Sequence, residues 1–460
     1  MNSDASRRAE NALLIAAAGA DTRLPDADAV ARLDWRYLLV AAGEQGITPL
    51  LAHRVGQERY PVPSHVADHL HAAYWTNHFR NRVLLAQLQR LLAAAAAEGI
   101  AIMPLKGAVL ATWYYATPAL RPMSDLDLLV HPADTARLAR LLSVRGFTIV
   151  PKPASLLNER REAAQFREHG VVAQADGIAV LVEYRSEALD PAVGPLLLAN
   201  PEMEAAYHRH NLRMWQRSQV AQLGDQPCAR LSAEDLLLHV ASHLTTRHAG
   251  LRLLWLRDLA EVATVHQDTL DWEYICDTAR RLHLSTPIAA GLAASARWLG
   301  APIAHAPIAR LRYASGRRAL WPVVERRMFD AEIAALGTAD LAKVAPPLAW
   351  RSLAVSIGWF LAGRAPWRTF GRIVVPSRAY MAWWYIGPVG LRQQYWRAVG
   401  FRIAYVGFSA FTALATRLRA HAVARCTGRL VRRMHARTPY GMHDDPDDRK
   451  RASEKPLSPR

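Results

Sequence analysis

Apolar positions along the first 98 residues recur at three- and four-residue spacing, which is the pattern of amphipathic helices. The spacing is clearest at Leu84, Leu88, Leu91 and Leu92. These leucines belong to the run RNRVLLAQLQRLLAAAAAEGI, whose alanine-rich end stops at Gly99, a common helix-ending residue. The pattern therefore predicts a helical region over residues 1–98.

Short apolar runs replace the helical pattern after Gly99. Residues 100–105 predict a buried strand, and Pro104 predicts that ladder pairing stops there. A Lys-Gly turn follows, then a helix, and residues 125–130 predict a second strand. Glycine lets the backbone approach a ligand, and the next helix offers free N–H groups to an anion. The stretch thus predicts a strand, turn, helix and strand around a ligand site.

The pattern further along predicts more elements. Asp134 is expected to cap a helix, and another strand is expected at 147–150. The signal weakens over 151–174, and IAVLVEY at 178–184 then predicts a strand. Helices are expected over 231–263, where Ser232 resembles a capping residue, and over 271–335.

This order of elements predicts an α+β fold with a small mixed sheet embedded between largely helical regions. The chain has 460 residues, of which 51% are hydrophobic, so it can bury a large core and a disordered chain is excluded. We expect five regions. They are helical residues 1–98, the core at 99–200, helical residues 201–340, a basic aromatic helical region at 341–440, and a disordered tail at 441–460.

Positive charge is concentrated near the carboxyl end of the chain. Residues 341–440 hold Lys343, fifteen arginines and no acid, so sixteen of the seventeen net positive charges lie there. Such clustered charge attracts anionic lipid headgroups or a nucleic-acid backbone, although a solvated arginine-rich surface is the simpler interpretation. Trp383 and Trp384 favour a membrane surface over sequence-specific nucleic-acid binding.

Three widely spaced cysteines argue against a disulfide framework or a zinc knuckle, and they favour a reducing compartment. The first residues do not resemble a secretory signal. Arg351 and Arg402 interrupt the two most apolar stretches of the basic region, so no transmembrane helix is predicted. We expect a cytoplasmic protein, with residues 341–440 as the candidate contact to a membrane.

Two carboxylates open the strand at 125–130. Asp125 and Asp127 are two residues apart, so both point to one face of the strand, which suits Mg²⁺ and nucleotide phosphate. The alternative is a strand-start turn with solvated carboxylates. Glu183, near the end of the apolar strand at 178–184, is the candidate third acid, with a surface pair to Arg185 as the alternative.

Three motifs carry a resemblance to a known family: LKGAVL at 105–110, RPMSDLDLLV at 121–130, and LSAEDLLLHVASH with LLWLRDLAEV at 231–262. In this order they resemble the uncharacterised nucleotidyltransferase family of bacteria, a branch of the DNA polymerase beta-like superfamily. The resemblance covers roughly residues 80–265. It implies that Asp125 and Asp127 bind Mg²⁺, that Glu183 completes the metal site, and that the glycine turn contacts the nucleotide phosphates.

Four residues are candidates for nucleotide binding: Lys106, Gly107, Arg121 and Ser124. Lys106 is expected to pair with the triphosphate, and the alternative is that it only caps or shields the turn. The sequence departs from the wider superfamily, which often has Gly-Ser at this turn. Members of this branch often have a histidine near the position of Arg185.

The predicted activity is Mg²⁺-dependent transfer of NMP from an NTP to a hydroxyl of an unidentified small molecule, sugar or protein. One alternative is a catalytically inactive adaptor of the same fold that binds a membrane or polyanion. Another is an antitoxin-like transferase that modifies a partner protein. His239, His243 and His248 suggest a metal cluster, but the absence of an HExxH motif favours helix packing.

Overall fold

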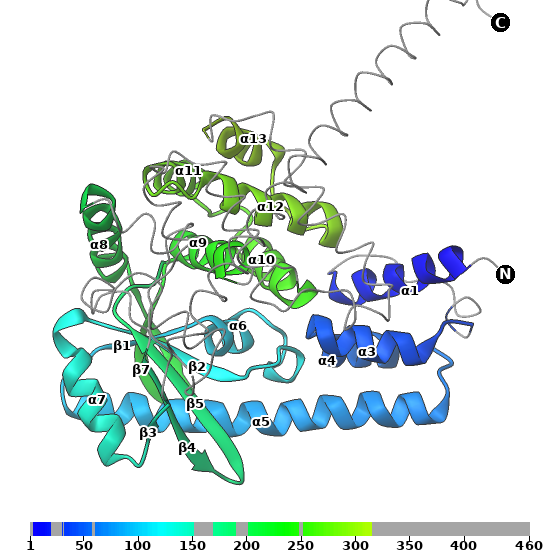
Figure 1. Cartoon of the computed structure of the whole chain (residues 1–460), viewed down its shortest axis with the longest axis horizontal. Helices are drawn as coiled ribbons and strands as arrows, with labels where there is room; N and C mark the ends of the chain where they lie inside the picture. Colours follow the sequence, from blue (N-terminus) through cyan, green and yellow to red (C-terminus); the bar gives the residue numbers. More distant parts are fainter. Residues whose placement is uncertain are drawn as a thin grey trace, which may run out of the picture. The chain divides into compact units, whose positions relative to one another are not determined.

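The computed structural model describes residues 3–19, 30, 32–57, 60–150, 169–189, 201–247 and 252–314. Within these ranges the chain forms twelve α-helices and a five-stranded mixed sheet (Figure 1), which confirms the predicted α+β fold. No helix in these ranges is long and apolar enough to cross a membrane. The predictions for residues 341–440 and 441–460 lie outside the described residues, and the expected domain boundaries stay predictions.

The amino-terminal part is helical, as its apolar spacing predicts. Its helices are α1 (Ser3–Ala18), α3 (Trp35–Gln45), α4 (Thr48–Gln57) and α5 (Ser64–Ala97). The predicted leucine- and alanine-rich helix is the second half of α5. The chain leaves α5 through Gly99, whose left-handed φ of 63° suits glycine. Helix α5 therefore ends where the sequence predicts.

Five strands form the main sheet in the order β1-β2-β5-β4-β3. They are β1 (Ile102–Leu105), β2 (Asp125–Val130), β3 (Thr148–Ile149), β4 (His169–Ala175) and β5 (Ile178–Arg185). Strands β2 and β5 are parallel, and the other neighbours are antiparallel. The prediction that pairing stops at Pro104 is wrong, because the register continues to Leu105 opposite Asp127. Proline is tolerated there because β1 is an edge strand.

The two faces of the sheet belong to different parts of the core. Leu126 and Leu128 of β2 pack in one apolar cluster with Leu88 of α5 and Leu138 of α7 (Thr135–Val144). Figure 1 shows α5 running alongside the sheet. On β2, the alternate residue Leu129 joins the larger cluster formed with the helical region. Because strand side chains alternate, Asp125 and Asp127 lie on the face that carries Leu129.

Two hairpins contain strands that the sequence analysis missed. Strand β4 pairs with β5 through a turn at Asp176 and Gly177, which both have positive φ. Asp-Gly is a strong hairpin signal, so the sequence does carry a clue to β4. Strands β6 (Gln219–Leu223) and β7 (Gln226–Arg230) form a separate two-stranded sheet.

The capping predictions have opposite outcomes. Ser232 caps the next helix as predicted, since its Oγ accepts a hydrogen bond from the Asp235 N–H, an interaction worth about 1 kcal/mol. Asp134 stands before α7 but makes no capping hydrogen bond, because its Oδ1 accepts from Nη1 of Arg137 at 2.6 Å.

The predicted helices beyond residue 200 are present as far as the structure describes them. They are α8 (Pro201–Gln216), α9 (Ala233–Ser242), α10 (Leu253–Val265), α11 (Trp272–Arg281), α12 (Ser285–Leu299) and α13 (His305–Ala314). Their buried apolar residues join those of α3, α4 and β1 in the larger cluster. This shared core brings α10 to the carboxylate-bearing side of the sheet.

Candidate active site

Two aspartates lie at the start of β2. The Oδ1 atom of Asp125 accepts a hydrogen bond from Oγ of Ser124 at 3.0 Å. Burial and the charge of Asp127 raise the pKa of Asp125, while Lys106, the Ser124 hydrogen bond and Arg121 act in the opposite direction. Two like charges held together in this way favour the binding of a cation.

Lys106 reaches this pair directly from the end of β1. Its Nζ lies 2.5 Å from Oδ1 of Asp127, and both side chains are largely buried. Lys106 also has a left-handed φ of 46°, which is uncommon for a residue other than glycine. The turn between β1 and α6 (Lys106–Trp113) therefore holds an ammonium group against the second aspartate.

Gly107 is required here by close packing. A Cβ atom at this position would lie 2.7 Å from Nη1 of Arg121 and 3.1 Å from Cγ of Met123. Atoms at these distances would overlap with any larger side chain. The Lys-Gly turn is therefore packed against the segment that leads into Asp125.

Arg121 is held by a carboxylate of the helical region. Its Nε and Nη2 donate to the two carboxylate oxygens of Asp258, at 3.2 and 2.8 Å. The Tyr115 hydroxyl donates to the same carboxylate at 2.9 Å. Arg121 is 7% exposed and Asp258 is 1% exposed. The structure places the Arg121 guanidinium against Asp258, and its predicted contact with nucleotide phosphate stays a prediction.

Glu183 lies beside the second aspartate. It pairs with Asp127 in the parallel register of β2 and β5, so the two residues lie on the same face of the sheet. In the part of the chain that the structure describes, no group of three or more His, Cys, Asp or Glu side chains is arranged to hold a metal ion. Asp125 and Asp127 alone fit Mg²⁺, which usually takes one or two carboxylates and completes its shell with substrate phosphates.

Arg80, which was not predicted as a site residue, reaches the same segment from α5. Its Nε donates to the Met123 carbonyl at 3.0 Å and its Nη2 to the Ser124 carbonyl at 3.2 Å. Asn81, one residue further, donates to the carbonyls of Pro118 and Arg121 at 2.6 and 2.8 Å. The clue in the sequence is a set of polar residues on the apolar face of a long helix.

The predicted histidine cluster has a packing role in the residues described. The rings of His239 and His243 stack with centroids 6.3 Å apart. Nδ1 of His239 lies 2.8 Å from the carbonyl oxygen of Ala188, and no metal-binding group is found in the described ranges. His248 lies outside these ranges.

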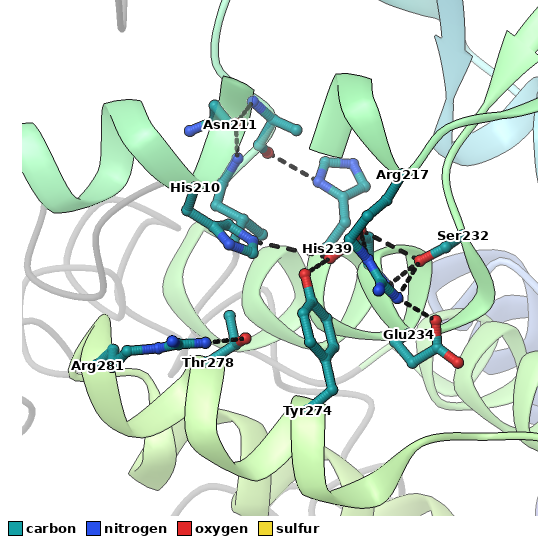
Figure 2. Close-up of polar contacts among 12 residues, drawn as sticks. His210, Asn211, Arg217, Ser232, Glu234, His239, Tyr274, Thr278 and Arg281 are labelled. Atoms are coloured by element: carbon teal, nitrogen blue, oxygen red, sulfur yellow. Dashed lines mark hydrogen bonds and ion pairs between the residues drawn. The ribbon is translucent and has the colours of Figure 1, made fainter. Parts of the chain in front are cut away.

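A second buried polar network surrounds His239 in the helical region, and Figure 2 shows it between α8, α9 and α11. Its centre is Asp235, which is fully buried and accepts from Nε of Arg217 at 3.2 Å and from the Tyr274 hydroxyl at 2.7 Å. Burial lowers the pKa of the neighbouring His210 to about 4. The network joins helices and contains none of the predicted site residues.

Fold and site together define a class of protein: an α+β chain with paired aspartates and a Lys-Gly turn on one side of a mixed sheet. A family model described as uncharacterised nucleotidyltransferase matches residues 31–300. The chain belongs to this family, as its motifs predict. No curated protein and no solved structure matches the chain. The matched range includes both the sheet and α10, so the aspartates and Asp258 lie within one family unit.

Proposed function

We propose that the protein is a Mg²⁺-dependent nucleotidyltransferase that moves NMP from an NTP to a hydroxyl group of an acceptor. The observation that carries the proposal is the grouping of Asp125, Asp127 and Lys106 at the start of β2. The family match supports the reaction class. The base of the nucleotide and the acceptor are left open, with a small molecule, a sugar or a protein as candidates.

Asp125 and Asp127 would hold the metal. When bound, Mg²⁺ supplies charge neutralisation at the phosphate oxygens, which is the main requirement of such transfer reactions. Lys106 would exchange its contact with Asp127 for one with the triphosphate. Ser124, which already bonds Asp125, would fix the carboxylate or contact a phosphate. Gly107 lets the turn lie close to the substrate.

Glu183 is proposed as the third carboxylate. Its place opposite Asp127 supports this role, since both lie on one face of adjacent strands. There it would receive the proton of the acceptor hydroxyl or contribute to metal binding. A carboxylate at this position would help to activate the nucleophile without forming a covalent bond to substrate.

A catalytically silent adaptor is the second candidate, and two observations favour it. Lys106 already neutralises Asp127, and the described residues contain no three-residue metal group. Calorimetry with ATP or CTP, with and without Mg²⁺, separates the two functions. Metal-dependent nucleotide binding supports the transferase, and binding only to polyanions supports the adaptor.

Asp127→Asn tests the transferase. We expect the variant to lose Mg²⁺-dependent transfer of the labelled NMP to the acceptor, and with it pyrophosphate release, while its circular dichroism spectrum stays unchanged, because the amide cannot replace a carboxylate ligand. The assay uses each of the four NTPs, α-labelled, in a cell lysate that supplies the acceptor. Asp134→Asn, which removes a carboxylate paired with Arg137, is the matched control. Equal turnover in Asp127→Asn and the wild type would exclude the metal role.

A further inference from the structure

Asp258 is a buried carboxylate of the helical region whose bonds all lead toward the candidate site. Its two oxygens accept three hydrogen bonds, two from Arg121 and one from Tyr115. Tyr115 follows α6 closely, and Arg121 stands four residues before Asp125. One side chain of α10 therefore holds both segments that flank the site.

The Arg121 guanidinium transmits this contact to the Lys-Gly turn. A Cβ atom added at Gly107 would lie only 2.7 Å from Nη1 of Arg121, so the guanidinium and Gly107 are in close contact. The same Nη1 donates to the carbonyl of Pro122 at 3.0 Å, and the Arg121 carbonyl accepts from Asn81. A change in the orientation of Arg121 would thus displace the turn and the approach to Asp125.

Stability alone does not account for a buried ion pair at this place. Removing two charges from water costs several kcal/mol per ion, and apolar residues of similar volume often stabilise a fold equally well. Neighbouring residues of α10, such as Leu256 and Leu259, already pack in the large apolar cluster. What the ion pair adds is a fixed direction for the guanidinium, since a bidentate contact restrains its plane.

We propose that Asp258 is a positioning residue of the candidate active site, acting through Arg121 on the Lys-Gly turn and on the segment before Asp125. The inference rests on the proposed function. Under this proposal, Asp258 in the α10 motif WLRD helps to align the residues that bind metal and phosphate, although Asp258 itself touches neither the metal nor the phosphate.

The test compares Asp258→Asn with Asp235→Asn in the full-length protein. Both aspartates are almost completely buried and bonded to an arginine and a tyrosine, but only Asp258 is bonded to the site segments. Hydrogen exchange is measured over residues 105–124. Mn²⁺ affinity is measured by electron paramagnetic resonance with inorganic tripolyphosphate, a probe that needs no knowledge of the base.

We expect Asp258→Asn to accelerate exchange over residues 105–124 and to weaken Mn²⁺ binding by about 10- to 100-fold, the usual effect of losing an outer-shell partner. Asp235→Asn should lose comparable thermal stability but keep the wild-type exchange rates over residues 105–124 and the wild-type Mn²⁺ affinity. Tyr115→Phe, which removes one hydrogen bond, should give a smaller change of the same kind and serves if Asp258→Asn does not fold.

Two failures can be told apart. If the wild type binds no Mn²⁺ with tripolyphosphate, the proposed metal site is wrong and the positioning role of Asp258 is overturned with it. If the wild type binds Mn²⁺ and Asp258→Asn matches Asp235→Asn in affinity and in exchange, only the positioning role is overturned.

Discussion

Lys106 shows how one residue combines an uncommon backbone with a defined electrostatic task. Its left-handed φ and its contact with Asp127 occur together at the end of β1. Strained backbone of this kind persists only where surrounding structure holds it, and it is enriched at functional sites. The ammonium group occupies the place at Asp127 that the proposed metal ion would take.

Lys106→Met should therefore have opposite effects on two ligands. Mn²⁺ affinity of the protein alone should rise, by up to about tenfold, because no ammonium competes for Asp127; a tenfold change corresponds to about 1.4 kcal/mol. Affinity for tripolyphosphate should fall, because a positive charge is lost. Calorimetry measures both, with the exposed Arg90→Met as control. An unchanged metal affinity would show that Lys106 does not compete with the cation.

Glu187 is a buried carboxyl group that makes stability depend on pH. It is 1% exposed, and its Oε1 lies 3.0 Å from Nδ1 of His208. Burial raises the pKa of Glu187 to about 9, although Arg185 acts in the opposite direction. The unfolded chain loses this proton near pH 4.5, whereas the folded chain keeps it until about pH 9. Stability should thus fall between these values as pH rises, by about 1.4 kcal/mol per pH unit.

Glu187→Gln should remove this dependence, since an amide does not titrate. The variant should be more stable than the wild type at pH 8, and the difference should shrink toward pH 5. Urea denaturation at pH 5, 6, 7 and 8 measures it, with exposed Glu98→Gln as control. Parallel pH profiles for Glu187→Gln and the wild type would contradict the prediction.

The placement of a single residue was predictable where its spacing in a strand determines which face it lies on. The shared face of Asp125 and Asp127 follows from strand alternation, and the structure has both residues in β2. The partner of Arg121 was not predictable, because Asp258 is 137 residues away in sequence. A pattern along the chain carries no information about which distant carboxylate an arginine meets.

At the scale of elements, strongly apolar or strongly periodic segments were predictable, and strands with weak apolar alternation were not. Strands β2 and β5 match their predicted places closely, and helix α5 ends where predicted but begins at Ser64, well before the predicted run. Strand β4 was missed because its apolar alternation is weak, although the turn at Asp176 and Gly177 marks it. Helix α5 also has a function that its leucine spacing does not reveal, which is to bind the segment before β2.

Asn81→Ala should test this function of α5. The substitution leaves the Arg121 carbonyl without this donor, whereas the Pro118 carbonyl still accepts from the Arg121 N–H at 3.3 Å. An unsatisfied buried group costs about 1–3 kcal/mol, so the free energy of unfolding should fall by about that amount, measured by urea denaturation. Arg82→Ala, an exposed residue of the same helix, should change it little. Equal losses in the two variants would show that the Asn81 contacts are unimportant.

At the scale of the whole molecule, the positive charge and the candidate site lie in different parts of the sequence. Residues 31–300 match the family, whereas almost all of the net charge lies in residues 341–440, which the described ranges do not include. Composition alone thus predicts binding to an anionic surface through residues 341–440, a property separate from the chemistry of the candidate site.

Liposome flotation tests the membrane prediction. The full chain should float with vesicles containing phosphatidylserine and remain below with neutral vesicles, and deletion of residues 341–440 should abolish flotation. Adding salt should weaken the binding, because clustered arginines act through screened charge. The same flotation with and without this segment would rule out the lipid prediction.

The parallel pairing of β2 and β5 has a consequence for how the chain folds. Many residues separate these two strands in the sequence. The entropy cost of closing this long loop must be met before the strands can pair and stabilise the fold. Asp127 and Glu183 can therefore meet only late in folding, after the helix and hairpin contacts nearby have formed. We expect the nascent chain to be unable to bring Glu183 beside Asp127 until residue 185 has left the ribosome.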